Sequence, residues 1–145
     1  MINGVWIQDG PTFSATDPST GISLPGSFYR ADAKAVAAAA RAAQAALPGY
    51  RALPFRRRAE FLRSIAQKID EAADQIVGRA QQETALPETR LRGETARTSG
   101  QLRLFANWVE EGSWLDARID RADPNRKPAA KPDLRLANEP IGLVA

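Results

Sequence analysis

This 145-residue chain contains neither cysteine nor histidine, so any catalysis must rely on other side chains or on residues that lie elsewhere. Those two absences exclude a thiolate nucleophile, the common zinc sites and a histidine proton shuttle from these residues. Three consecutive arginines, Arg56 to Arg58, lie near the expected start of a helix. Positive charge there opposes the helix dipole, so the run indicates carboxylate or phosphate partners, of which Glu60 or another part of the protein is the simplest. We assign no catalytic, cofactor-binding or metal-binding residue from these patterns.

Charged residues of both signs are mixed along the chain, with 20 basic and 17 acidic residues and a net charge of +3. This balance, together with 43% hydrophobic residues, is typical of a soluble globular protein. No aromatic residues alternate with the arginine run, so we expect no nucleic-acid partner. The opening residues lack the pattern of a secretory signal, and no apolar run approaches the roughly 20 residues of a membrane span. We therefore expect a cytoplasmic protein without a membrane partner.

The first third of the chain predicts short strands followed by a helix. Glycine and proline interrupt the first thirty residues, with a hairpin turn expected at 17–21 and short strands at 5–7, 12–16 and 27–30. Asp32 is a suitable N-cap. In the alanine-rich segment after it, apolar residues recur at steps of 4, 3 and 4, namely Val36, Ala40, Ala43 and Leu47. This pattern predicts a helix that ends at Pro48 and Gly49.

Two further helices are predicted, and each carries an apolar stripe. The second begins near Pro54 and has its stripe, at steps of 3, 4, 3 and 4, along Leu62, Ile65, Ile69, Ala72 and Ile76. Leu86 and Pro87 interrupt the pattern, and the third helix runs from there to Gly112, a natural helix end. We interpret the stripe of the second helix as core residues rather than as cofactor contacts.

The C-terminal part predicts extended structure. Segments 114–121 and 133–145 are separated at 122–132 by a loop rich in proline, lysine and aspartate, and we expect a hairpin there. The last residues, Ile141 to Ala145, are apolar on both faces, as in a buried strand of a parallel sheet that leads into a helix. Because no helix follows, we expect a truncated piece of a larger protein.

Several of these segments, in this order, resemble the N-terminal region of the aldehyde dehydrogenase superfamily. Residues 2–6 and 17–21 are similar to the family's ING-x-W strand and NP-x-TG turn, with Asp17 in place of asparagine. Residues 57–62 are similar to its ERA-x-x-L helix, with Arg57 in place of glutamate. Residues 138–144 are similar to its REPIG-x-V strand, with Asn138 in place of arginine. The resemblance implies the N-terminal part of an α/β fold, with short strands, three main helices and a C-terminal β-hairpin.

The resemblance is greatest to the group of the family that oxidises α-ketoglutaric semialdehyde (2,5-dioxopentanoate). Segments 86–91, 100–106 and 112–120 carry it, whereas 83–88 departs from the family's common E-T-G-K-P segment. It implies an enzyme in which a cysteine thiolate attacks the aldehyde, hydride passes to NAD or NADP, and a glutamate-activated water releases the acid. None of those groups can be placed on this chain. We therefore expect the segment alone to be inactive and to bind no cofactor.

The resemblance also implies roles for parts of the chain. Residues 1–113 would belong to the cofactor-binding domain, 114–138 would join subunits into a homo-oligomer, and 139–145 would begin the nucleotide-binding sheet. The third helix would pass the substrate entrance, where Arg97 or Gln101 could meet the carboxylate of a small-molecule aldehyde. The alternatives are that Arg97 is a surface arginine paired with Glu94 or with neighbours near Glu110, and that 114–138 is a solvent-exposed hairpin.

A function of a different class stays open at this point. The chain could be a non-catalytic helical interaction module, or a degenerate gene fragment that has kept the family's N-terminus. Such a module would fold and stay monodisperse as it stands, whereas the exposed apolar strand expected at 141–145 argues against that behaviour.

Overall fold

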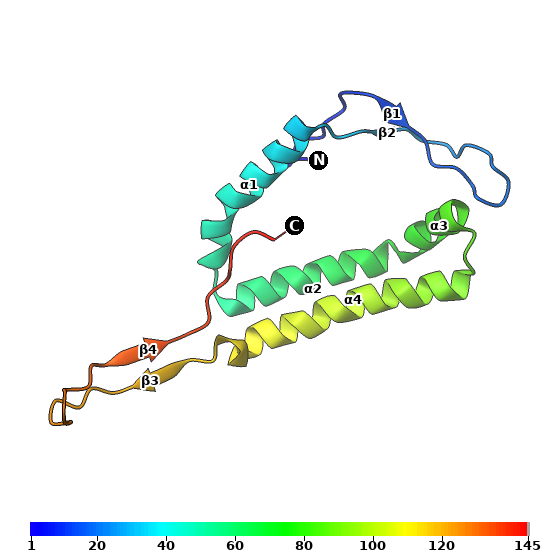
Figure 1. Ribbon diagram of the computed structural model, residues 1–145. Helices are drawn as coiled ribbons and strands as arrows, with labels where there is room; N and C mark the ends of the chain where they lie inside the picture. Colours follow the sequence, from blue (N-terminus) through cyan, green and yellow to red (C-terminus); the bar gives the residue numbers. More distant parts are fainter. Residues whose placement is uncertain (145) are drawn as a thin grey trace.

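The computed structural model describes residues 1–144, and in them helices dominate (Figure 1). Two antiparallel pairs of very short strands, one near each end of this range, accompany the helices. In chain order the elements are β1 (Thr12–Phe13), β2 (Phe28–Tyr29), α1 (Ala33–Arg51), α2 (Phe55–Glu71), α3 (Ala73–Thr84), α4 (Glu88–Glu111), the 3₁₀ helix η1 (Ser113–Leu115), β3 (Arg118–Asp120) and β4 (Leu134–Leu136).

The seam between α2 and α4 is the most closely packed part of the molecule. The two helices lie side by side and antiparallel, with α3 at the turn between them (Figure 1). The buried residues at this seam are small, namely Ala59, Ala66, Ser99 and Ala106. Small side chains allow two helix backbones to approach closely, so the alanine positions determine how near α2 and α4 can lie.

The end of the first helix differs from the sequence-based prediction, whereas its start agrees with it. The first helix does not end at Pro48 but continues through it to Arg51. Proline has no N–H and so removes one helical hydrogen bond, but the carbonyl of Pro48 still accepts one from the amide of Ala52 at 3.1 Å and the helix continues. The helix start is as predicted, because the Asp32 carboxylate accepts a hydrogen bond from the amide of Ala35 at 2.7 Å.

The expected second helix is divided into α2 and α3, so the described residues contain four α-helices rather than three. The break lies at Ala72, whose φ and ψ of −94° and 3° interrupt the helix. The apolar stripe changes direction there. Val77 is buried on α3, whereas Ile76, the last residue of the predicted stripe, is exposed. The physical reason is that a periodicity counted from Leu62 no longer applies once the helix axis turns.

The N-terminal strands are shorter than predicted, while the turn between them is confirmed. Val5 forms only an isolated bridge with Ile2, and 5–7 is not a strand. In the turn at 17–21, the carbonyl of Asp17 accepts a hydrogen bond from the amide of Gly21 at 2.8 Å. The guanidinium of Arg79 on α3 donates to the carbonyl of Pro25 at 2.8 Å, which ties this hairpin to the helices.

The C-terminal hairpin, residues 114–138, is called the arm below. Strands β3 and β4 pair antiparallel, with Ile119 opposite Arg135, and chiefly contact each other rather than a helix. The arm extends beyond the ends of α2 and α4 (Figure 1). The strand predicted at 141–145 is wrong for 141–144, which form no strand, and Ala145 lies outside the described residues. A strand needs a hydrogen-bonded neighbour, and no described residue pairs with 141–144.

Candidate functional site

The face of α4 that points away from α2 carries the candidate residue Arg97. Ser99 and Ala106 are buried at the seam and therefore define the inner face of α4. At 100° per residue, the outer stripe half a turn away consists of Arg97, Gln101, Leu104 and Trp108, spaced by 4, 3 and 4 residues. All four side chains are exposed. The structure thus places Arg97 and Gln101 together on one accessible face, as the sequence predicts for residues at i and i+4.

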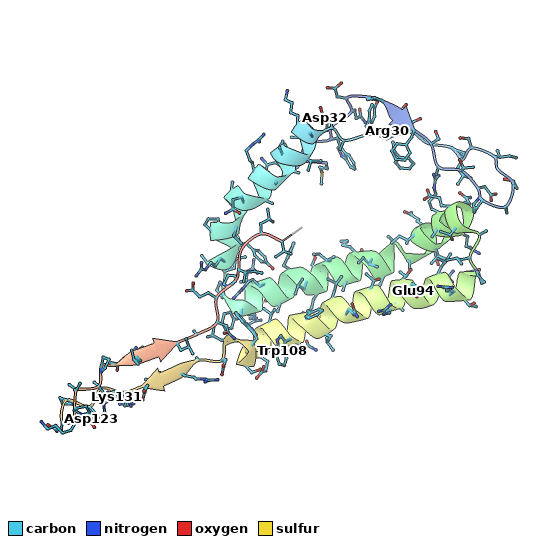
Figure 2. The ribbon with its side chains drawn as sticks, viewed as in Figure 1. Arg30, Asp32, Glu94, Trp108, Asp123 and Lys131 are labelled. Carbon is cyan, nitrogen blue, oxygen red and sulfur yellow. The ribbon has the colours of Figure 1, made fainter. Side chains whose placement is uncertain are left out.

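An apolar hollow of about 570 Å³ adjoins this stripe toward the C-terminal end of α4. It is open to solvent, and Leu104, Phe105 and Trp108 are each more than half exposed. Figure 2 shows Trp108 near this end of the helix and Glu94 toward the other. The residues that line the hollow are Leu104, Phe105, Asn107, Trp108, Glu111 and Ser113. One face of α4 therefore combines a cationic group with an apolar surface.

The guanidinium of Arg97 is only weakly held by its neighbour. Its Nη1 lies 3.4 Å from Oε2 of Glu94, and the side chain of Arg97 is 70% exposed. An exposed ion pair of this length contributes little to stability, and it leaves most of the five donors of the guanidinium accessible. The other expected neighbour, Glu110, pairs with Arg63 of α2 instead, at 2.5 Å. Arg97 is thus a surface arginine beside Glu94, and most of its donors face solvent.

Ion pairs across the seam hold α4 in this orientation. Arg103 lies 2.5 Å from Asp70, and Arg63 lies 2.5 Å from Glu110. Hydrogen bonds from the Ser99 hydroxyl and from Arg103 lower the pKa of the Asp70 carboxyl. A hydrogen bond from Arg63 likewise lowers the pKa of Glu110. These charges face α2, so they orient the outer stripe without belonging to it.

The run from Arg56 to Arg58 divides into two kinds of contact. Arg56 and Arg57 both pair with Glu60, at 3.1 and 2.8 Å, as the sequence indicates. Arg58 does not. Its guanidinium carbon lies 4.9 Å from the centroid of Phe55 and 5.6 Å from that of Trp114. The spacing of Phe55 and Arg58 by one helical turn could have indicated the first contact, but no local signal indicates Trp114.

Two negative findings concern the described residues alone. Within 1–144, no group of three or more acidic side chains is placed to bind a metal ion. Across the same range, none of the helices combines the length and the apolar character that a membrane span requires.

The chain belongs to the aldehyde dehydrogenase family, whose model matches residues 6–145. One curated relative, α-ketoglutaric semialdehyde dehydrogenase 2 of Azospirillum brasilense, is 44% identical over 134 residues, which cover 92% of this chain and 26% of the relative. The α-ketoglutaric semialdehyde dehydrogenase of Acinetobacter baylyi is 43% identical over 118 residues, or 81% of this chain and 22% of the relative. The family and group resemblance seen in the sequence is thereby confirmed.

Solved structures give the same result for the fold. An aldehyde dehydrogenase from Brucella melitensis biovar abortus matches with a TM-score of 0.76 and 27% identity, over 86% of this chain and 26% of that chain. An NADP-dependent enzyme of Escherichia coli matches with a TM-score of 0.75 and 28% identity, over 83% of this chain and 25% of that one. The α/β aldehyde dehydrogenase-like fold class is confirmed. The chain spans about a quarter of the length of these relatives.

Proposed function

We propose that this chain is part of an NAD(P)-dependent aldehyde dehydrogenase that oxidises α-ketoglutaric semialdehyde to α-ketoglutarate. The observation that carries the proposal is the 44% and 43% identity to two α-ketoglutaric semialdehyde dehydrogenases. By contrast, relatives named for glutarate semialdehyde, succinate semialdehyde or N-succinylglutamate semialdehyde are only 28–32% identical. All of these aldehydes carry a carboxylate, so a cationic group at the substrate entrance suits the whole set.

The reaction centre itself is expected outside these residues. The 145 residues contain no cysteine, so the thiolate must come from another part of the protein. The described strands are also only two or three residues long and antiparallel. They therefore do not form the parallel strand, glycine-rich turn and helix that bind the pyrophosphate of a dinucleotide. In the proposed division, 1–113 belongs to the cofactor-binding domain, 139–145 enters its sheet only when strands from the rest of the protein lie beside it, and NAD or NADP is bound by other residues.

We assign to Arg97 the binding of the substrate carboxylate. Its weak pairing with Glu94 leaves the guanidinium available, and the fork of donors matches two carboxylate oxygens. Gln101 lies one turn further along the same face and can donate a further hydrogen bond. Further along the same face, Leu104 and Trp108 provide an exposed apolar surface.

The test uses the intact gene product and measures initial rates of NADH or NADPH formation. Oxidation of α-ketoglutaric semialdehyde is expected with a higher kcat/KM than oxidation of succinate semialdehyde or pentanal. Formation of neither reduced cofactor with any aldehyde would instead support the interaction module or degenerate fragment. An intact mass from the host that equals the 15.7 kDa of this chain would favour the same alternative.

The role of Arg97 has its own test. The substitution Arg97→Ala is expected to raise KM for the carboxylate-bearing semialdehyde about tenfold to a hundredfold, because a charged hydrogen bond contributes about 1.5–3 kcal/mol. Pentanal has no carboxylate and serves as the matched control, with an unchanged kcat/KM. Equal effects on both aldehydes, or no effect on either, would contradict the assignment.

We also propose that the arm joins subunits into a homo-oligomer. It extends beyond the helices (Figure 1), and its apolar side chains Ile119, Leu134 and Leu136 are 64%, 54% and 60% exposed. Exposed apolar strands with free edges are typical of segments that pair with another chain. Ile119→Asp is expected to lower the mass in solution. A deletion of 122–132 that leaves the mass unchanged would show that the tip, which carries Asp123 and Lys131 (Figure 2), is dispensable.

A further inference from the structure

The arm is attached to the helices through one aromatic residue, Trp114. Its ring centroid lies 5.1 Å from that of Phe55, the first residue of α2. The indole nitrogen donates a hydrogen bond to the carbonyl of Val109 on α4 at 3.2 Å. Trp114 therefore contacts the start of α2 and the end of α4 at once, at the point where the chain leaves the helix pair.

Both strands of the arm are tied to this same point. The side-chain amide of Asn138, beyond β4, donates to the carbonyl of Trp114 at 2.9 Å. The backbone amide of Asn138 donates to the carbonyl of Leu115 at 2.8 Å. Beyond this root, β3 and β4 chiefly contact each other. Trp114, Leu115 and Asn138 thus join both strands of the arm at one point beside the helix pair.

Arg58 completes the root from the side of α2. Its guanidinium lies within 6 Å of the centroids of both Phe55 and Trp114, which is the range in which a ring attracts a cation. Its Nε is buried and has no hydrogen-bond acceptor among the described residues. Burial of a donor without an acceptor is unfavourable, so the two rings must provide the attraction that holds Arg58 in this place. Its neighbours Arg56 and Arg57, by contrast, pair with Glu60 in solvent.

We propose that Arg58 is a positioning residue for subunit assembly. By lying against both Phe55 and Trp114, it fixes the angle at which the arm leaves the helix pair. The partner is a second copy of this chain. The arm can present Leu134 and Leu136 on one face of the hairpin, or Ile119 on the other, to this partner only if that angle is held. This inference rests on the proposed assembly through the arm.

The experiment compares Arg58→Met with Arg57→Met in the intact gene product. Both substitutions remove one positive charge and keep the side-chain length, but only the first removes the cation from the two rings. Light scattering over a range of concentrations gives the dissociation constant of the oligomer. Hydrogen exchange of segments 113–120 and 134–138 reports the arm, and exchange of α3 and α4 serves as the internal reference.

Arg58→Met is expected to raise the dissociation constant at least tenfold and to accelerate exchange in the arm at least tenfold, with α3 and α4 unchanged. Arg57→Met should leave both measurements unchanged, and Arg58→Lys, which keeps a cation, should recover most of the wild-type behaviour. Values for Arg58→Met equal to those for Arg57→Met overturn the inference. Acceleration that is equal in the arm and in α3 and α4 also overturns it, because it indicates general destabilisation.

Two further outcomes are decisive. If Arg58→Met does not fold, Trp114→Leu leaves α2 unchanged and must show the same weaker assembly and faster exchange; wild-type values in that variant overturn the inference. A wild-type protein that stays monomeric at all concentrations overturns the proposed assembly together with this inference. A wild-type oligomer that Ile119→Asp dissociates and Arg58→Met does not leaves the proposed assembly intact and overturns only the role of Arg58.

Discussion

The seam between α2 and α4 and the arm show two different ways of building structure from one chain. The seam buries Ala59, Ala66 and Ala106 completely, and ion pairs such as Arg103 with Asp70 lie beside them. The arm pairs only three residues of each strand and leaves the apolar side chains Ile119, Leu134 and Leu136 exposed. Its internal contacts are too few to make an isolated two-stranded hairpin stable in water.

Because the seam and the arm differ in this way, substitutions can change the stability of the fold and the assembly of subunits separately. Substitutions at the seam act on the folding of the helices, because close packing leaves no room for larger side chains. Substitutions on the arm should instead change the contacts that the arm makes with another subunit. The junction between the two, at Gly112 and Trp114, belongs to both, and it is there that the comparison can be tested most directly.

The largest effect is expected from overpacking the seam. Ala106→Leu places three additional carbon atoms where α4 touches α2, and it should lower the free energy of unfolding of the intact gene product by about 3 kcal/mol. Thermal or urea unfolding measures the change. Ala96→Leu, at an exposed position of the same helix, is the matched control and should change it by less than about 0.5 kcal/mol. Equal losses would mean that the seam does not limit the packing.

A smaller loss is expected at the junction. Gly112 has φ of 86°, and a Cβ added there would lie 3.3 Å from Cε2 of Phe55. Gly112→Ala should therefore lower stability by about 1–2 kcal/mol, because an L-residue is strained in this conformation. Gly100→Ala is the control, since its Cβ meets nothing within 4 Å inside a helix, and it should raise stability by roughly 0.5–1 kcal/mol. Two changes of the same sign in unfolding experiments would contradict the backbone argument.

A substitution at the other end of the helix pair is expected to raise the free energy of unfolding. Ala85 ends α3 in the left-handed region with φ of 55°, the kind of position where helices usually end with glycine. It also falls where the family's E-T-G-K-P segment has its glycine. Ala85→Gly should raise the free energy of unfolding by less than about 1 kcal/mol, because relief of strain is offset by the greater freedom of the unfolded chain. A loss of stability in this variant would show that the methyl group packs usefully.

The sequence predicted best the features that depend on neighbouring residues. Asp32 caps α1, Pro87 and Gly112 bound α4, and Asp17 forms the first turn, and each of these signals acts within a few positions. The break at Ala72 has no such signal, because alanine favours helix and neither glycine nor proline is near. Tertiary packing, and not local helix propensity, therefore determines where the helix breaks.

In the candidate site, too, the features that depend on neighbouring residues could be predicted, and those that depend on tertiary contacts could not. The outward position of Arg97 follows from helical periodicity once Ser99 and Ala106 are known to be buried. The stacking of Arg58 on Trp114 could not be predicted, because the two residues lie in different elements and meet only in the fold. The strand expected at 141–145 depended on a neighbouring strand, which pattern alone cannot supply.

The smallest expected effect is the pH dependence of the seam. Hydrogen bonds from Ser99 and Arg103 lower the pKa of Asp70 below its ordinary 3.8, and Arg63 lowers that of Glu110 below 4.5. A carboxyl whose pKa is lowered by folding stabilises the folded protein fully above its unfolded pKa and loses this contribution as pH falls through its folded pKa.

The free energy of unfolding should thus stay level between pH 7 and about 5 and decline below about 4.5. The exposure of both pairs keeps the decline small. The double variant Arg63→Met with Arg103→Met should reduce the decline in urea titrations without abolishing it, because the hydrogen bond from Ser99 to Asp70 remains. Arg57→Met should leave the decline unchanged, and an unchanged acid limb in the double variant would show that the arginine pairs do not contribute to it.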